Sequence, residues 1–519
     1  MKRSFKIFAL ILAFFIMFSS LVACDINDAL DYLNGVLETS DTTTKEDEET
    51  TVIGDEQSTI IFDEDSDETT VSIGEETTVV IDDDTIEVFP DGFPNVDKNN
   101  YDSTFYLSMM PDSNPIDYYW IEEDDGSMLS RALYERQAKI KNYLGVEILA
   151  SYTSADYNVY TEDFKTAVKN KSGGIDTLLT HVHWGVSGLI SGGFLRPFGD
   201  LPGVNIDAEY WNQDIMKDLS VCDEYLLGFS DFNLPYTYVI TYNADLLEKY
   251  DDALDKSVYQ MVDDYEWTLQ QFIDIAKLGY IDNGAVDKNQ YGLTGVQWIP
   301  WCGFLESCGV NLVEMNNKGT YEISYMNDAY RQRTENIVLL LSELAAANYS
   351  CVDYMTNAAP TVPFETGRAL MTLTSTYDIN NYRNYEIEFG ILPYPAYDTN
   401  QKEYRSLQWG GYLVVPAYID NENMVGDTME MLAFFSRDVK TVYCQNVAIN
   451  YDDARMMALV LDSLCTDFGL PFRDVCGDPL FMLPQVTSGS MTLPIFYEGR
   501  THGGNTSLLN FIKKAAKKY

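Results

Sequence analysis

The stretch that decides the fold is NLPYTYVITYNADLLEKY, residues 233–250. After Pro235, aromatic and β-branched residues alternate from Tyr236 to Thr241, which is typical of a strand that runs through a protein interior. Asn243 and Asp245 can then cap a short helix. The stretch therefore predicts a buried strand that leads directly into a helix.

Strands and helices alternate in the same way between residues 101 and 180. Apolar residues recur at helical spacing from Ser127 to Leu144, and Gly145 stops that helix. The other elements expected here are strands at Thr104–Met110, Val146–Tyr152 and Ile175–Thr180, and a helix at Tyr160–Lys169. This alternation predicts an α/β fold with parallel strand pairing. Helices are also expected at Asp452–Leu464 and at Asn505–Lys518, the second of them capped by Asn505.

The N-terminus has the features of an export signal. Lys2, Arg3 and Lys6 precede an apolar run, Phe8–Phe18, that is shorter than the roughly 20 residues a membrane span needs. Residues 1–24 are therefore expected to be a signal peptide. The sequence Leu21–Cys24 (LVAC) resembles the bacterial lipobox, which implies that Cys24 is acylated and attaches the protein to the outer face of the cell membrane. An ordinary cleaved signal peptide is the alternative.

Residues 25–100 are strongly acidic and rich in Thr. They contain 24 Asp and Glu residues but only two Lys, and the sequence Glu-Thr-Thr-Val occurs three times, at residues 49–52, 68–71 and 76–79. Such a segment has little apolar surface to bury, and like charges extend it. It is predicted to be a disordered tether, with a cation-binding or partner-binding tail as the alternative.

The remaining part, of about 420 residues, is long enough for two lobes. The whole chain carries a net charge of −47, and its body is acidic as well as its tether. An acidic body repels nucleic acid and anionic lipid, so no nucleic-acid partner is expected and a neutral or cationic ligand is favoured.

Seven cysteines follow Cys24, and an odd number cannot pair completely within one chain. No CxxC motif occurs, so the sequence supports neither a zinc ribbon nor a thioredoxin-like site. A local disulfide between Cys302 and Cys308 is one reading for an exported protein. We favour free, mostly buried thiols.

Several segments resemble the family 1 extracellular solute-binding proteins, the sugar-binding receptors of ABC importers. The segment 233–250 resembles the one with which that family crosses between lobes, and Phe364–Met371 resembles its F-x-x-G-(K/R)-x-A-M signature, with Leu370 where Ala is usual. The remaining similar segments are Trp120–Ile148, Ile175–Pro197, Glu266–Leu269, Tyr291–Leu293 and Phe389–Pro395.

The resemblance implies a two-lobed periplasmic-binding-protein fold, type II-like, with crossings near Leu234, Leu392 and Tyr443. Lobe 1 would comprise residues 101–235 and 396–445, and lobe 2 residues 236–395 and 446–519. A solute, most simply an oligosaccharide, would bind in the cleft between the lobes and favour closure by touching both. The partners implied are the permease subunits of an ABC transporter, and the protein would be a monomer.

A sugar site needs flat aromatic rings and planar polar groups in a groove shielded from water. Of the seven Trp residues, Trp211 and Trp267 are expected in the core. His183 and Trp184 directly follow the third strand, at the edge where ligands meet open α/β sheets. Trp298 and Trp301 lie in a loop after the Tyr-Gly strand, so we expect platforms there.

Other candidate ligand-binding residues lie near the crossings and the F-x-x-G motif. Trp409 and Tyr412 flank two glycines that let backbone approach a ligand, and Tyr236 lies on the crossing strand. Tyr377 follows the motif at a place where the family often has a stacking aromatic, and Asn233 and Asp378 would supply polar groups.

Enzymatic readings find weaker support. His181 and His183 would share one face of a strand, as in some metallohydrolases, but only His502 remains as a third histidine. The stretch that begins at Asp287 starts like an EF-hand but has Trp298 at position twelve. We therefore predict no catalytic residues, no metal and no cofactor. An exported carbohydrate-active or metal-dependent hydrolase, or a two-lobed sensor without a transporter, is the alternative.

Overall fold

The computed structural model describes residues 92–111, 114–233, 236–353 and 361–519, together with the backbone of five strands between Thr51 and Pro90. The chain divides into two compact units, Met1–Asn95 and Val96–Tyr519. The signal peptide and Cys24 lie outside the described residues.

The first unit contains an antiparallel sheet with the strand order β1-β2-β3-β4-β5. Its strands are β1 (Thr51–Val52), β2 (Ser58–Phe62), β3 (Thr69–Ile73), β4 (Thr77–Asp82) and β5 (Thr85–Pro90). This differs from the expectation that the segment has no fold. Strands β3 and β4 begin at the first Thr of a Glu-Thr-Thr-Val repeat and β1 at the second Thr of another, and Val71 pairs with Val79. Alternating β-branched residues favour a pleated strand. The prediction for this segment gave more weight to its acidic composition than to this alternation.

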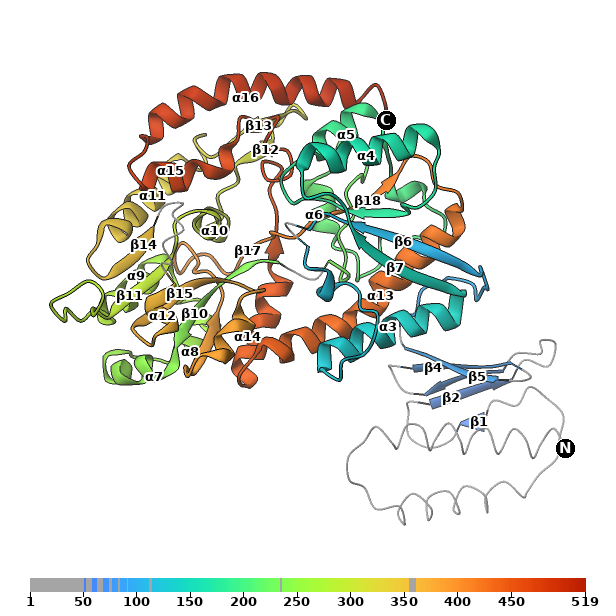
Figure 1. Ribbon diagram of the computed structural model, residues 1–519, viewed down its shortest axis with the longest axis horizontal. Coiled ribbons are helices and arrows are strands. Elements are labelled where there is room, and N and C mark those ends of the chain that lie inside the picture. The colour runs from blue at the N-terminus through green and yellow to red at the C-terminus, as the bar shows by residue number, and fades with distance from the viewer. Residues whose placement is uncertain are drawn as a thin grey trace, which may run out of the picture. The chain divides into compact units, whose positions relative to one another are not determined.

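The second unit contains two five-stranded sheets (Figure 1). The first sheet has the order β7-β6-β8-β18-β9, in which β6 runs parallel to β7 and β8, and β18 runs antiparallel to β8 and β9. Its strands are β6 (Ser103–Met109), β7 (Val146–Tyr152), β8 (Thr177–Leu179), β9 (Leu195–Arg196) and β18 (Leu413–Pro416). Its helices are α3 (Met128–Leu144), α4 (Tyr157–Asn170), α5 (Val186–Gly192) and α6 (Gln213–Asp218).

The second sheet has the order β14-β11-β15-β10-β16. Its strands are β10 (Tyr238–Asn243), β11 (Tyr291–Val296), β14 (Ser350–Asp353), β15 (Ala369–Ser375) and β16 (Phe389–Leu392). The helices between them are α7 (Ala244–Leu247), α8 (Val258–Asp263), α9 (Leu269–Leu278), α10 (Ile299–Ser307), α11 (Arg331–Ala346) and α12 (Val362–Glu365). Strand β11 is parallel to β14 and β15, whereas β10 is antiparallel to β15 and β16.

The two sheets with their helices confirm the expected α/β, two-lobed fold, but the strand pairing is mixed rather than parallel throughout. The antiparallel members, β10 and β18, are the strands that the chain enters when it arrives from the other sheet. Parallel pairing is favoured where a crossover helix joins two strands of one sheet. A strand that the chain enters from the other sheet has no such crossover helix, so it can pair in the antiparallel direction.

The chain passes between the sheets at three places. Phe232 and Asn233 precede β10, and the segment after β16 carries the short strand β17 (Ser406–Leu407) on its way to β18. Helix α13 (Glu422–Val447) packs along α3 and leads into α14 (Tyr451–Asp462), which packs on β16 (Figure 1). The lobe boundaries given above remain a prediction.

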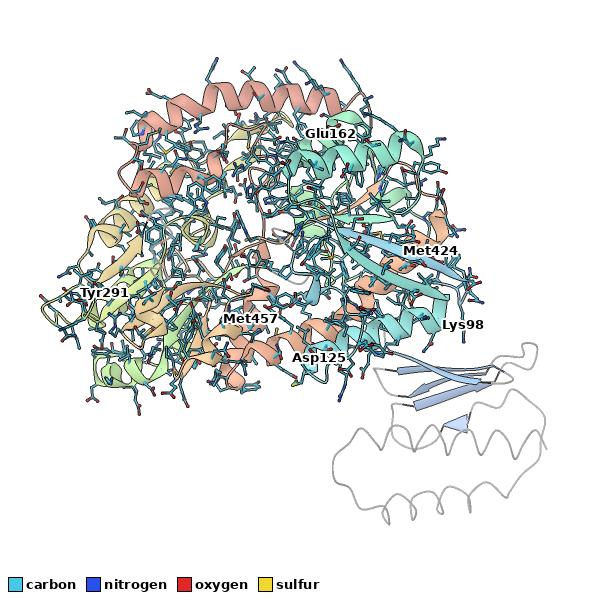
Figure 2. The ribbon with its side chains drawn as sticks, in the orientation of Figure 1. Lys98, Asp125, Glu162, Tyr291, Met424 and Met457 are labelled. Carbon is cyan, nitrogen blue, oxygen red and sulfur yellow. The ribbon has the colours of Figure 1, made fainter. Side chains whose placement is uncertain are left out.

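Local signals in the sequence explain most helix ends. Ser127 accepts a hydrogen bond from the backbone of Ser130 at the start of α3, and Gly145 ends that helix at φ 64°. The Asn243 side chain accepts from the backbone N–H of Leu246 at the start of α7, as predicted. Met424 of α13 and Met457 of α14, both labelled in Figure 2, are buried in the core.

The C-terminal part of the chain contains β19 (Leu464–Cys465), which pairs with β17, the short helix η5 (Pro479–Phe481), α15 (Met482–Thr487) and α16 (Leu493–Ala515). The prediction that the last helix begins at Asn505 is wrong. Pro494 lies in the first turn of α16, where proline is well tolerated. Asn505 lies within the helix, and its side-chain oxygen accepts a hydrogen bond from the backbone N–H of Ile323.

Helix α16 contacts parts of the chain that belong to both sheets. It packs on α5, which follows a strand of the first sheet, and on β13 (Tyr321–Ile323), which pairs with β12 (Val313–Met315) in the connection between β11 and α11 (Figure 1). Beyond the helix, the Tyr519 hydroxyl donates a hydrogen bond to the Leu195 carbonyl in β9.

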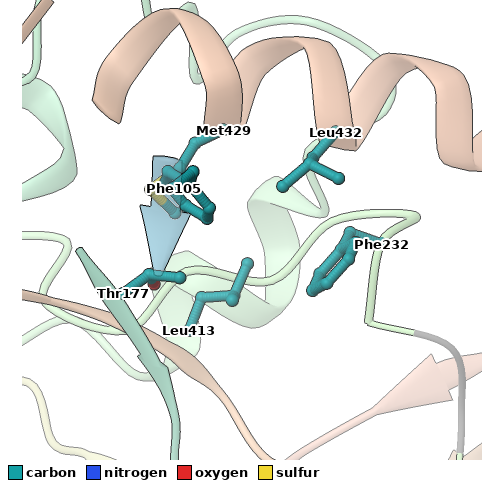
Figure 3. Close-up of a pocket in the computed structure, with 6 residues that line it drawn as sticks. All are labelled: Phe105, Thr177, Phe232, Leu413, Met429 and Leu432. Atoms are coloured by element: carbon teal, nitrogen blue, oxygen red, sulfur yellow. The ribbon is translucent and has the colours of Figure 1, made fainter. Parts of the chain in front are cut away.

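The interior is closely packed, and its cysteines are free. A cavity of about 10 Å³ under α13 is lined by Phe105, Thr177, Phe232, Leu413, Met429 and Leu432, and it is apolar and no larger than one water molecule needs (Figure 3). The seven cysteines after Cys24 are all free, and Cys302, Cys308, Cys444 and Cys476 are buried. The preference for free thiols over a Cys302–Cys308 disulfide is confirmed.

Candidate functional site

The turn after β8 carries His181, His183 and Trp184, and it is held tightly. His181 and Trp184 form an isolated bridge, and the Tyr160 hydroxyl donates to the Trp184 carbonyl. Gly185 then has φ 89°, and a Cβ there would lie 2.5 Å from the Thr161 methyl group, so only glycine fits. The turn therefore presents His183 and Trp184 in fixed positions at the carboxyl end of a central strand.

Gly411 allows the segment that carries Trp409 to lie close to that turn. A Cβ on Gly411 would lie 2.0 Å from the Thr180 carbonyl oxygen. The backbone N–H of Gly411 donates to Asn114 Oδ1 at 2.9 Å, and Asn233 Nδ2 donates to the Gly411 carbonyl at 3.0 Å. The N–H of Trp409 donates to the Tyr236 carbonyl at 2.8 Å. These bonds fix Trp409 between the end of β8 and the start of β10.

Aromatic rings from both sheets form a continuous series, which we call the aromatic row. Within the row the ring centroids of His183 and Trp409 are 5.0 Å apart, and those of Tyr238 and Trp409 are 6.4 Å apart. At one end, Trp298 stacks on Phe481 at 4.0 Å with an interplanar angle of 6°. The row consists, in order, of Tyr377, Tyr236, Tyr238, Trp409, His183, Phe481 and Trp298.

The row draws on the carboxyl ends of strands from both sheets. His183 follows β8 of the first sheet, whereas Trp298 follows β11 and Tyr377 follows β15 of the second. Trp409 and Phe481 are buried, at 3% and 4% exposed, while Tyr377 at one end is 41% exposed and Trp298 at the other end is half-buried. The row therefore runs from the surface into the region between the two sheets.

Five of the predicted ligand-binding residues lie in the row: His183, Tyr236, Trp298, Tyr377 and Trp409. The others have different surroundings. The Trp301 side chain is fully buried and contacts Phe304, and Tyr412 is fully buried with its hydroxyl 2.9 Å from that of Thr466. Asn233 is buried and bonded to backbone, as described above.

Trp184 and Asp378 lie beside the row. The Trp184 ring is 5.8 Å from that of Tyr157, and its face is covered by the Arg473 guanidinium at 5.2 Å. Asp378 is exposed and accepts a hydrogen bond from the Ser375 hydroxyl at 2.5 Å. Both are close to members of the row in sequence, but neither ring nor carboxylate is part of it.

The polar groups of the row are neutral. Burial, the nearby His181 and Arg473 lower the pKa of His183 to about 2, so its imidazole carries no charge at physiological pH. Within the described residues His183 Nδ1 and Gln408 Oε1 are buried without a hydrogen-bond partner. A hydroxyl both donates and accepts, so a hydroxyl-rich ligand can satisfy either atom.

Sequence reasoning missed Tyr238, Phe481 and Arg473. Tyr238 had a signal, because it begins β10 two residues after Tyr236, and residues two apart in an extended chain point to the same side. Phe481 and Arg473 had no such signal in the sequence, because the segment between β19 and α15 shows no helical or strand-like periodicity. Only the fold brings that segment next to His183 and Trp298.

The described residues contain no group of three or more His, Cys, Asp and Glu side chains arranged to hold a metal ion. Across the same residues, no helix has the length and apolar character needed to cross a membrane.

Two sheets with a row of aromatic rings between them are the arrangement expected of a solute-binding protein. The chain belongs to the bacterial extracellular solute-binding protein family, whose model matches residues 141–435, more than half of the sequence. Membership of this family places the protein outside the cytoplasm. No curated protein matches the chain.

Three solved structures to which the chain is similar are a receptor and two binding proteins. One is the GacH receptor of Streptomyces glaucescens GLA.O, studied with acarbose, at 14% identity and a TM-score of 0.48, covering 80% of this chain and 99% of that one. Another is the maltose-maltodextrin binding protein of Alicyclobacillus acidocaldarius, at 13% identity and 0.47, covering 80% and 100%. A third is the ABC substrate-binding protein Lmo0181 of Listeria monocytogenes, in complex with cycloalternan, at 12% identity and 0.48, covering 81% and 99%.

Proposed function

We propose that this protein is a receptor that binds an oligosaccharide between its two sheets and delivers it to the permease subunits of an ABC importer. It binds the sugar without chemical change, acts as a monomer and is held to the membrane by a lipid on Cys24. Membership of the solute-binding family supports the receptor role.

The observation that carries the choice of ligand is the aromatic row. A sugar ring has apolar C–H faces that stack on aromatic rings, and its hydroxyl groups need planar polar partners. The row supplies rings from both sheets, and His183 Nδ1 and Gln408 Oε1 supply buried polar atoms without protein partners. A ligand that contacts both sheets favours the arrangement in which they lie close together.

The charge state of the row favours an uncharged ligand. His183 is neutral, and the carboxylate of Asp378 lies at the exposed end, beside Tyr377. Ions buried without partners are unfavourable, so a neutral, hydroxyl-rich molecule suits the buried part better than a charged one. Lobe 1, residues 101–235 and 396–445, and lobe 2, residues 236–395 and 446–519, would close around it.

The test is binding without turnover. The full-length protein is applied to a glycan array, and each sugar bound is then incubated with it in solution and recovered. We expect a rise in melting temperature with the bound sugar, about 2.7 kcal/mol of stabilisation at a hundredfold excess over Kd, and unchanged sugar by mass spectrometry. Cleaved sugar would indicate a hydrolase instead, and no glycan binding would contradict the oligosaccharide.

A further inference from the structure

The segment between β19 and α15 approaches both sides of the candidate site. On one side, Ser187 of α5 donates to Asp474 Oδ2 at 2.5 Å. On the other side, the Cys302 thiol of α10 lies 3.2 Å from the Leu480 carbonyl oxygen. The segment thus touches elements that follow a strand of each sheet, as a bound solute would.

Phe481 is the part of this segment that enters the aromatic row. Its ring lies 4.0 Å from that of Trp298 and almost parallel to it, and 6.2 Å from that of His183. A separation of 4.0 Å is van der Waals contact, so no sugar ring can lie between Phe481 and Trp298. The Phe481 ring occupies one face of Trp298 in the way that a sugar would.

The position of Phe481 is built into the fold. Gly477 and Asp478 have φ values of 81° and 57°, which turns the chain sharply just before η5. The Arg473 guanidinium lies 4.7 Å above the Phe481 ring and 3.4 Å from Asp478 Oδ1. The left-handed backbone conformation of Asp478 and the Arg473 guanidinium over the Phe481 ring hold that ring against Trp298.

We propose that Phe481 is a specificity-determining residue that ends the sugar site at His183 and so limits the length of the oligosaccharide bound. This inference rests on the proposed function. Sugar units stack along the row from Tyr377 toward His183, and one face of the next ring, Trp298, is already covered by the Phe481 ring. Removal of the Phe481 ring exposes that platform to one more sugar unit.

The test compares full-length wild type with Phe481→Leu and Phe481→Tyr by calorimetric titration with linear glucose and mannose oligomers of increasing length. Leu keeps an apolar side chain without a flat ring, and Tyr keeps the ring. We expect the affinity of wild type and of the Tyr variant to stop rising at one length. The affinity of the Leu variant should rise about 2- to 10-fold further with the next unit.

A double variant, Phe481→Leu with Trp298→Ala, should lose that gain, and melting temperatures without sugar verify that each variant is folded. The same length dependence in wild type and Phe481→Leu, or weaker binding of every length by Phe481→Leu, overturns this inference while leaving the receptor function intact. Binding of no oligomer by any of the proteins counts against the oligosaccharide function and this inference together.

Discussion

Asn114 Oδ1 accepts a hydrogen bond from the backbone N–H of Gly411, 297 residues further along the chain, at 2.9 Å. The Nδ2 group of the same fully buried side chain donates to the carbonyl oxygens of Met110 and Thr180, both at 2.9 Å. One amide therefore joins the ends of β6 and β8 to the segment that carries Trp409.

Replacing this amide should destabilise the protein. Asn114→Leu leaves the Gly411 N–H and two carbonyl groups buried without partners, and we expect the free energy of unfolding to fall by about 1–3 kcal/mol. Urea denaturation measures the change. Asn142→Leu on the exposed side of α3 serves as the control, and an equal effect of both variants would contradict the role of Asn114.

The two glycines after Trp409 should respond differently to the same substitution. Gly411→Ala places a methyl group 2.0 Å from the Thr180 carbonyl oxygen, whereas the nearest atom to a Cβ on Gly410 is 3.6 Å away. We expect Gly411→Ala to lower the melting temperature and abolish sugar binding because the segment must move, and Gly410→Ala to resemble wild type. Thermal denaturation and titration test both, and equal behaviour of the pair would refute the close approach.

Trp409 and Trp301 should separate ligand binding from stability. Trp409→Leu keeps an apolar side chain but removes the ring that contacts His183 and Tyr238, so we expect sugar affinity to fall about tenfold or more. Trp301→Phe changes a fully buried ring outside the row and should lower stability with little change in affinity. Calorimetric titration of the folded variants decides, and a loss of affinity only in Trp301→Phe would place the site elsewhere.

Asp176 should make stability depend on pH. Burial raises its pKa to about 6 from 3.8, although the hydrogen bond from the Tyr106 N–H, at 2.8 Å, opposes the rise. Its stabilising contribution is therefore fully present below pH 3.8 and is lost as the pH rises through about 6. We expect Asp176→Asn to remove about 2 kcal/mol of the fall in unfolding free energy between pH 4 and 7.

Urea denaturation at several pH values measures this effect, and the exposed Asp163→Asn on α4 controls for the loss of one negative charge. An Asp176→Asn variant whose stability falls as steeply with pH as that of wild type would show that this carboxyl is not responsible.

Cys24 should decide where the exported protein remains. We expect Cys24→Ser to release the protein from the membrane fraction into the medium, because the thiol is the proposed site of acylation. Fractionation and mass spectrometry of the N-terminal peptide give the answer. A lipid-free peptide from wild type would indicate an ordinary cleaved signal peptide instead.

Local signals account for the parts of the fold that the sequence predicts well. The helix α3, with Ser127 before it and Gly145 after it, and the strand β7 agree with prediction almost to the residue, because caps and apolar spacing act over a few residues. The start of α16 was missed because Asn505 was expected to cap the helix, whereas it lies within it. In the structure a Cβ on Gly504 would lie 2.4 Å from the Cys476 carbonyl, so that glycine serves packing rather than a turn.

The candidate site was predictable only where its residues follow strands. His183 and Trp298 could be proposed because the carboxyl ends of central strands meet ligands in open α/β sheets. Phe481 could not, since its place beside Trp298 depends on contacts between segments 183 residues apart in the chain.

Helix α16 has a consequence for how the protein opens. It lies across the molecule with its middle against β13, while its C-terminal end lies against α5 and Tyr519 reaches β9. If the two sheets move apart, α16 must lose its contacts either with α5 or with β13. The exchange of amide protons in its last turns would then report the population of the open form, which makes the C-terminus a reporter of a motion centred elsewhere.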